Sequence, residues 1–169
     1  MSKVNFLSQG YRCEEVKYDK ILGVCDPEGE APAYTSSLND CEDKWIATIQ
    51  NIKRKGIQFV PVDKNILVYR ANGDMEKTCD GMILYDRDRS FVELKDVRVG
   101  GWLSEAISQL VTTIEIFNRN HNYRDFEKRY AYPANCRHPQ FQCSCREQLQ
   151  EFRTKYHFTQ VPKAIIVIE

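Results

Sequence analysis

The fold of this 169-residue chain is decided by two short runs that flank a charged turn: residues 79–85, CDGMILY, and residues 90–95, SFVELK. Both runs are rich in β-branched, aromatic and other apolar residues, which favour strands. Residues 86–89, DRDR, are typical of the turn between them. Together the three segments predict a β-hairpin that carries acidic and basic side chains among apolar ones.

Two acids and a lysine are expected on one face of this hairpin. Side chains alternate between the two faces of a strand, so Glu93 and Lys95 share a face. A loop of two or four residues brings Asp80 directly opposite Lys95 and diagonal to Glu93. The same register pairs apolar residues on that face, with Leu84 facing Phe91 and Met82 facing Glu93. A strand face that is apolar and ends in charged groups favours a buried site over a solvated surface.

The rest of the chain predicts helices and strands around the hairpin. Apolar residues at helical spacing, preceded by the capping pair Asn39 and Glu42, predict a helix over 40–55. A longer apolar stripe predicts a second helix over about 102–120. The remaining elements expected are strands at 57–62, 66–70, 128–132 and 164–168, and a helix at 144–156.

This order predicts a single α/β domain over 1–169, with a central mixed sheet flanked by helices. Residues 1–38 are expected to be an irregular N-terminal extension, broken by a short strand or helix near 16–24. Residues 39–132 form the expected core, and residues 133–169 add a C-terminal helix and strand.

The charged residues of the hairpin suit a divalent cation. Carboxylates such as Asp80 and Glu93 are the oxygen ligands that Mg²⁺ or Mn²⁺ prefers, and the backbone carbonyl of Leu94 is a candidate third ligand. A lysine at Lys95 is able to hold a water molecule or screen phosphate charge, and a general-base role stays open. The alternative is a plain cross-strand ion pair on an exposed hairpin.

Asp80, followed after twelve intervening residues by Glu93-Leu94-Lys95, resembles the motif of the PD-(D/E)xK nuclease superfamily, which has the restriction-endonuclease-like fold. That fold contains a helix, a three-strand meander carrying the motif, a second helix and a further strand. The resemblance implies that Asp80 and Glu93 hold the metal and that Lys95 is the catalytic lysine. One departure is Cys79, which stands where the motif has proline.

Residues on the expected helices extend this resemblance. Some members of the superfamily place a glutamine of the second helix near the active site, and Gln109 is the candidate here. Glu42 on the first helix is a candidate further metal ligand, with the helix cap as the alternative. Glu105, in the first turn of the second helix, is a candidate catalytic residue, with stabilisation of the helix dipole as the alternative. The resemblance implies a nuclease that hydrolyses phosphodiester bonds, with DNA favoured over RNA.

The net charge of the chain is zero, with 24 basic and 24 acidic residues, so nucleic acid has to be bound by a local patch. Basic and aromatic residues alternate over residues 119–141, which suits phosphate contact and base stacking. The candidate contacts are Arg119, Arg124, Lys128, Arg129 and Arg137. A solvated helix end and strand edge is the alternative interpretation.

Seven cysteines are many for this length, and four soft ligands lie close together at Cys136, His138, Cys143 and Cys145. Such a set is able to hold a structural Zn²⁺, although its spacing is tighter than that of common zinc sites. Free thiols in a reducing compartment are the alternative.

No apolar run reaches the ~20 residues that span a bilayer, and the N-terminus has no apolar signal segment. We therefore expect a cytoplasmic protein without a membrane partner, working as a homodimer or in a larger nucleic-acid-processing assembly. Two other functions stay open: a non-catalytic nucleic-acid-binding subunit and a zinc-stabilised interaction module.

Overall fold

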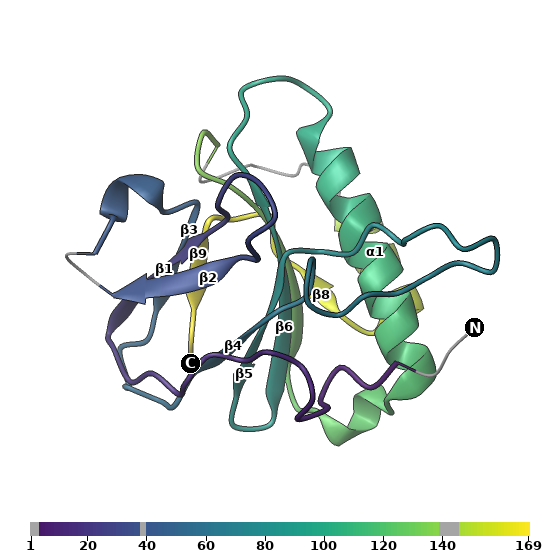
Figure 1. Ribbon diagram of the computed structural model, residues 1–169, viewed down its shortest axis with the longest axis horizontal. Coiled ribbons are helices and arrows are strands. Elements are labelled where there is room, and N and C mark those ends of the chain that lie inside the picture. The colour runs from purple at the N-terminus through teal and green to yellow at the C-terminus, as the bar shows by residue number, and fades with distance from the viewer. Residues whose placement is uncertain (1–3, 38–39, 139–145) are drawn as a thin grey trace.

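Three layers build the computed structural model, which describes residues 4–37, 40–138 and 146–169. A four-stranded sheet packs on one face of a five-stranded sheet, and two α-helices cover the other face (Figure 1). Both sheets are mixed, so the chain forms a single α/β domain as expected. Among the described residues, none of the helices has the length and apolar character needed to cross a membrane.

The five-stranded sheet has the order β4-β5-β6-β7-β8. Its strands are β4 (Gln58–Pro61), β5 (Gly81–Tyr85), β6 (Asp88–Lys95), β7 (Arg129–Asn135) and β8 (Thr159–Gln160). The first three run antiparallel as a meander, and β7 and β8 then add in parallel. The parallel connections pass through α1 (Trp102–Asn120) and α2 (Arg146–Tyr156).

Most of the predicted elements in this half of the chain are confirmed. The second helix begins and ends within the predicted bounds of about 102–120, and α2, β7 and β9 (Ile165–Val167) lie where a helix and two strands were expected. The strand predicted at 66–70 is wrong. Only Tyr69 there forms a bridge, to Met75, so β5 rather than that segment becomes the antiparallel partner of β4.

The four-stranded sheet has the order β2-β1-β3-β9, with β1 (Ile21–Cys25), β2 (Tyr34–Ser37) and β3 (Ala47–Gln50). The prediction of an irregular extension over 1–38 is therefore wrong, because β1 and β2 are integral to a sheet. The helix predicted over 40–55 is also wrong. Its place is taken by a single 3-10 turn, η1 (Glu42–Lys44), and by β3.

The packing of β3 explains why the helical spacing misled. Ala47 and Ile49 are buried, while the alternate residues Thr48 and Gln50 are half-buried, which is the two-residue period of a strand. Ile52, which belonged to the expected helical stripe, is 67% exposed. Strand pairing with β1 and with the distant β9 decides the structure of this segment.

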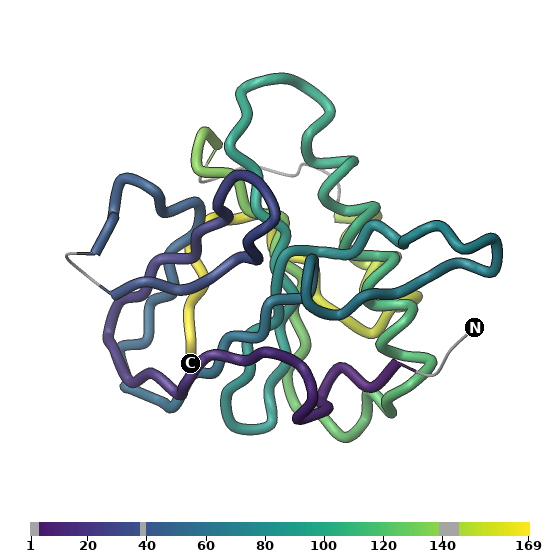
Figure 2. Tube along the Cα trace, viewed as in Figure 1, coloured from purple at the N-terminus to yellow at the C-terminus, as the bar shows by residue number. Residues whose placement is uncertain are grey.

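Two cores lie on the two faces of the five-stranded sheet. The core between the sheet and α1 includes Met82, Phe91, Leu110, Ile114 and Phe117. The core between the two sheets includes Leu22, Ile49, Phe59, Ile83, Val92 and Ile166. The N-terminal segment closes the first core at its lower edge (Figure 2). There the Val4 and Phe6 amides donate to Asn120 Oδ1 and His121 Nε2, at 3.1 Å each.

Gly81 is expected to be intolerant of a side chain, because an added Cβ would lie 2.2 Å from the buried Phe59 ring. We predict that Gly81→Ala lowers the free energy of unfolding by about 3 kcal/mol, a typical cost of overpacking. Thermal denaturation followed by circular dichroism measures this. Gly100→Ala is the matched control, since nothing lies within 4 Å of its added Cβ. Equal melting temperatures for both variants would contradict the packing described.

Candidate functional site

The hairpin between β5 and β6 is closed by a two-residue turn, Asp86-Arg87, with Tyr85 paired to Asp88. Asp86 has a φ of 45°, the left-handed conformation that such tight turns require and that Asp tolerates. The predicted loop lies one residue further along, at Arg87-Asp88, so the predicted partner of each residue is wrong by two positions. Met82 lies opposite Phe91 instead of Glu93.

The corrected register leaves every side chain on the face of the sheet that was predicted, because the partners shift by two residues and side chains alternate with a period of two. Continuing the register one step past the Gly81–Val92 pair places Asp80 beside Glu93 rather than beside Lys95. The two carboxylates therefore lie next to each other at the end of the meander, on the face that α1 covers.

Glu93 is the most deeply buried charged residue of this group, with a side chain 2% exposed. Its Oε1 lies 2.9 Å from Lys95 Nζ. Its Oε2 is buried and has no hydrogen-bond partner among the described residues. Burial first, and the nearby Asp80 carboxylate second, raise the pKa of Glu93 well above its ordinary value. One oxygen of this carboxylate is thus open to another ligand.

Asp80 is 8% exposed and accepts a hydrogen bond of 2.6 Å at Oδ2 from the Leu94 amide. Burial raises the pKa of Asp80 to about 7, although that hydrogen bond works against the rise. The N–H and C=O groups of one strand residue point to the same side of the strand. The Leu94 amide points toward Asp80, so the Leu94 carbonyl also lies on the side of β6 that faces β5 and Asp80. The structure therefore brings together the three predicted oxygen ligands.

Lys95 is held from three directions. Besides Glu93, its Nζ donates to Gln109 Oε1 at 3.1 Å and lies 3.4 Å from Glu105 Oε1. Burial lowers the pKa of Lys95, but Glu93 and Glu105 together outweigh it and raise the pKa overall. The side chain is therefore a cation at neutral pH. Gln109 also donates from Nε2 to the Thr78 carbonyl at 3.1 Å, which fixes α1 against the segment entering β5.

Asp26 is a site residue that sequence reasoning missed. It follows β1 in the loop to β2, where its carboxylate lies 3.9 Å from Lys64 Nζ. Burial raises the pKa of Asp26, and its charge is felt by both Asp80 and Lys95. The surrounding sequence, DPEGEAP, has only the character of a loop, so nothing local indicates its approach to the site. Packing of the two sheets brings it there.

Glu42 is not brought to this site. The helix predicted to carry it does not form, and it lies exposed in η1, within the layer of the four-stranded sheet. The predicted capping box also fails as a helix cap for that reason, and its other member, Asn39, lies outside the described residues.

The basic residues predicted to contact nucleic acid divide into two groups. Lys128 and Arg129 lie at the start of β7, beside Arg89 of β6. At the usual rise per residue, Arg89 is about 20 Å from Lys95 along β6. Arg119 and Arg124 lie near that same end, at the end of α1 and in η2 (Tyr123–Asp125).

Several of these side chains already have partners within the fold. Arg129 donates to the carbonyls of His157, Tyr123 and Phe126, so it acts as a structural tie. Lys128 Nζ lies 2.6 Å from Glu169 Oε2. Arg137 alone of the five lies near the carboxylate end of the sheet, where it pairs with Asp96.

The predicted zinc ligands are only partly described. Cys136 donates to Asp96 Oδ1 at 3.1 Å, and burial with this carboxylate raises its thiol pKa to about 11. His138 stacks near Trp102, with ring centroids 6.1 Å apart. Cys143 and Cys145 lie outside the described residues. Within residues 4–37, 40–138 and 146–169, no cluster of three or more His, Cys, Asp or Glu side chains is arranged to hold a metal.

The donors at the end of the meander nevertheless fit a hard divalent cation that keeps several waters. Two carboxylates and a carbonyl are oxygen donors of the kind that Mg²⁺ takes from a protein, with water completing its shell. The unpartnered Glu93 Oε2 is the observation that favours such a ligand. Two like charges this deeply buried also gain from a compensating cation.

Comparison with protein-family models, with curated proteins and with solved structures finds no match for this chain in any of the three.

Proposed function

We propose that the protein is a metal-dependent nuclease of the PD-(D/E)xK kind, which hydrolyses phosphodiester bonds in DNA. The observation that carries the proposal is the buried Glu93 carboxylate, with one oxygen on cationic Lys95 and the other open, beside Asp80. Buried carboxylates with raised pKa values in contact with a lysine are typical of catalytic sites.

Each residue has a defined part in this proposal. Asp80, Glu93 and the Leu94 carbonyl would hold Mg²⁺ or Mn²⁺, which activates bound water and stabilises charge on a phosphoryl group. Lys95, as a cation, neutralises phosphate charge and orients water, so the general-base role left open by its sequence is not part of the proposal. Gln109 and Glu105 fix the position of Lys95.

The order of elements from β4 onward supports the same proposal. The antiparallel meander β4-β5-β6 is followed by α1 and by β7, which pairs in parallel with β6. This is the order of the resembled fold after its first helix. The first helix has no counterpart, because η1 and β3 occupy the segment where it was expected.

A DNA-cleavage assay tests the proposal. Plasmid, linear and single-stranded DNA are incubated with the protein in Mg²⁺, in Mn²⁺ or in EDTA, and we expect cleavage only with metal. Glu93→Gln keeps the shape of the side chain but removes its charge, so we expect cleavage to fall at least about a hundredfold.

Glu127→Gln is the matched control, because Glu127 is an exposed carboxylate whose ion pair with Arg87 lies far from the meander's end. It is expected to cleave like the wild type. Wild-type protein that binds DNA without cutting it would instead indicate the binding-only function. The proposal extends to a cytoplasmic homodimer, since two such sites are able to cut both strands of a duplex in one encounter.

A further inference from the structure

An arm formed by residues 66–77 lies between β4 and β5, and in Figure 1 it is the teal loop that passes α1 and projects beyond it. Tyr69 and Met75 pair across the arm in antiparallel fashion. The Arg70 amide donates to the Asp74 carbonyl at 2.8 Å, next to the turn at the tip. The backbone of the arm therefore holds its two sides together where it projects from the domain.

The two faces of the arm differ, because side chains alternate along an extended chain. Ile66 and Val68 are buried in the core that α1 covers. Leu67, Tyr69 and Met75 point the other way and are 49%, 51% and 51% exposed. These three residues are called the arm ridge below. Large apolar side chains that gather in one place and stay exposed mark an interaction surface.

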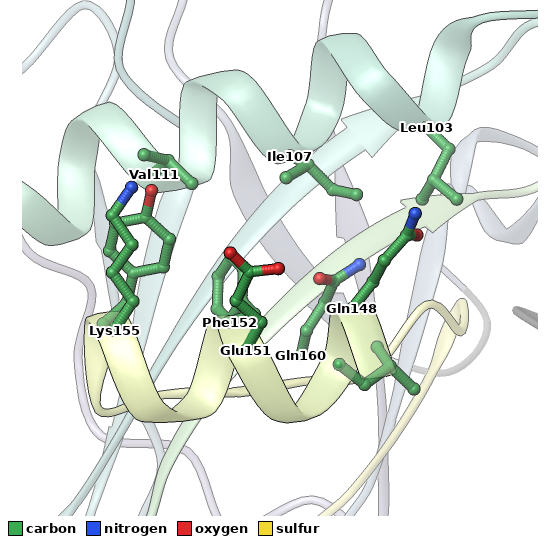
Figure 3. A pocket seen from close by; sticks show the side chains of 10 residues that line it. Leu103, Ile107, Val111, Gln148, Glu151, Phe152, Lys155 and Gln160 are labelled. Atoms are coloured by element: carbon green, nitrogen blue, oxygen red, sulfur yellow. The ribbon is translucent and has the colours of Figure 1, made fainter. Parts of the chain in front are cut away.

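The two helices leave the arm ridge uncovered. On one flank of α1, Leu103 and Ile107 face α2 (Figure 3). On the other flank, hydroxyl side chains such as that of Ser108 line a groove of about 630 Å³, whose opposite wall includes Arg70 and Lys77 of the arm. The arm thus turns a polar side toward α1, and its apolar ridge stays on the surface, where another molecule is able to reach it.

The arm leads directly into the candidate metal site. Thr78, the first residue after the arm, accepts a hydrogen bond of 3.1 Å from Gln109, and Gln109 in turn accepts one from Lys95. Asp80 follows Met75 by five residues, a span of at most about 18 Å. B-DNA covers that distance in about five base-pair steps. A DNA strand with a phosphate at Lys95 therefore has bases within reach of the arm ridge.

We propose that the arm ridge inserts between neighbouring bases of a DNA substrate and unstacks them close to the phosphate that is cut. This inference rests on the proposed nuclease function. Leucine and methionine are among the side chains with which proteins wedge base steps apart, and a tyrosine ring stacks on the base that is freed. Lys77, which is exposed and follows Met75 by two residues, suits a phosphate of the same strand. The enzyme therefore favours DNA with a mismatch, where unstacking costs least.

The probe is a DNA duplex with one mismatch and a 2-aminopurine beside it, a base whose fluorescence increases when it is unstacked. Binding is followed in Mg²⁺ with Glu93→Gln protein, in which cleavage is expected to be suppressed. We expect the fluorescence to rise on binding, and the rise to disappear when Leu67→Ser and Met75→Ser are added. Ile52→Ser is the matched control, since Ile52 is equally apolar and exposed but lies between β3 and β4. It should leave the rise unchanged.

Cleavage by protein with an intact Glu93 provides the second measurement. We expect the mismatched duplex to be cut at least about tenfold faster than the fully paired one, and the two ridge substitutions to remove this preference. Both substitutions are at exposed positions, so the melting temperature should stay that of the wild type.

The two measurements separate the inference from the function on which it rests. No rise in fluorescence, or a rise that the ridge substitutions leave unchanged, overturns the inference even if the protein cleaves DNA. A rise that depends on the ridge, in a protein whose wild type does not cleave, overturns the nuclease function and retains the ridge as a DNA-binding element. A dimer that the ridge substitutions dissociate, without a change in fluorescence, assigns the ridge to a second copy of the chain and also overturns the inference.

Discussion

Lys95→Ala is expected to lower metal-dependent DNA cleavage about a hundredfold to a thousandfold, with the protein still folded. The lysine is the only cation within hydrogen-bonding distance of the buried Glu93 carboxylate among the described residues. Its loss removes a positive charge from the place where phosphate charge has to be stabilised, and such losses have effects of this size. Initial cleavage rates at saturating DNA and metal measure the change.

Lys95→Arg separates the two roles that a lysine is able to play. If the cation orients water and screens phosphate, arginine retains much of the effect, and we expect activity about tenfold below wild type. If deprotonated Lys95 were the general base, arginine would be as inactive as alanine. Lys163→Ala replaces an exposed lysine and should cleave normally. Wild-type rates in Lys95→Ala would remove Lys95 from the mechanism.

Asp80→Asn is expected to stabilise the metal-free protein at alkaline pH. Burial raises the pKa of Asp80 to about 7 in the folded state, from its ordinary value of 3.8. The folded state therefore binds the proton more tightly, and stability falls as the pH rises through the window between these values. At about 1.4 kcal/mol per pKa unit, the ionised carboxylate costs up to about 4 kcal/mol above pH 7. Asparagine avoids this cost and keeps an oxygen for the Leu94 amide.

Thermal denaturation in EDTA at pH 5 and pH 8 measures this difference. We expect Asp80→Asn to melt several degrees above wild type at pH 8, and by less than half of that difference at pH 5, which lies only about 1.2 pH units above the ordinary pKa. Asp125→Asn is the control, an exposed aspartate of η2 that should show no such pH dependence. Added Mn²⁺ should raise the melting temperature of the wild type more than that of Asp80→Asn, since a bound cation compensates the same charge. If the difference in melting temperature between Asp80→Asn and the wild type did not change with pH, the burial of the Asp80 carboxylate would be contradicted.

The shared face of Asp80, Glu93 and Lys95 was predictable from sequence because side-chain alternation depends only on strand parity. The exact register was not, since a tight turn at residues 86–87 and one at residues 87–88 use the same kinds of residue. Likewise α1 carries a long, unambiguous apolar stripe, and its bounds follow from that stripe alone.

The part of the fold before residue 57 escaped prediction for a different reason. Residues 47–50 form a strand because β1 and β9 lie on either side of them, and β9 is more than a hundred residues away in the chain. The spacing of apolar residues within the segment does not indicate a partner so far away in the chain. Asp26 was missed for the same reason, because only the stacking of the two sheets carries its loop to the site.

The pairing of β3 with β9 also has a consequence for the order in which the molecule assembles. Ile49 lies opposite Ile166, so the sheet formed by the first fifty residues gains its last strand only when residues near 166 are available. Closing so long a loop is slow, and contacts of this range reduce folding rates. During synthesis β3 is left with an open edge until β9 has emerged from the ribosome. A nascent chain stalled before residue 160 should therefore be far more sensitive to protease at β1–β3 than a chain that includes residues 1–169.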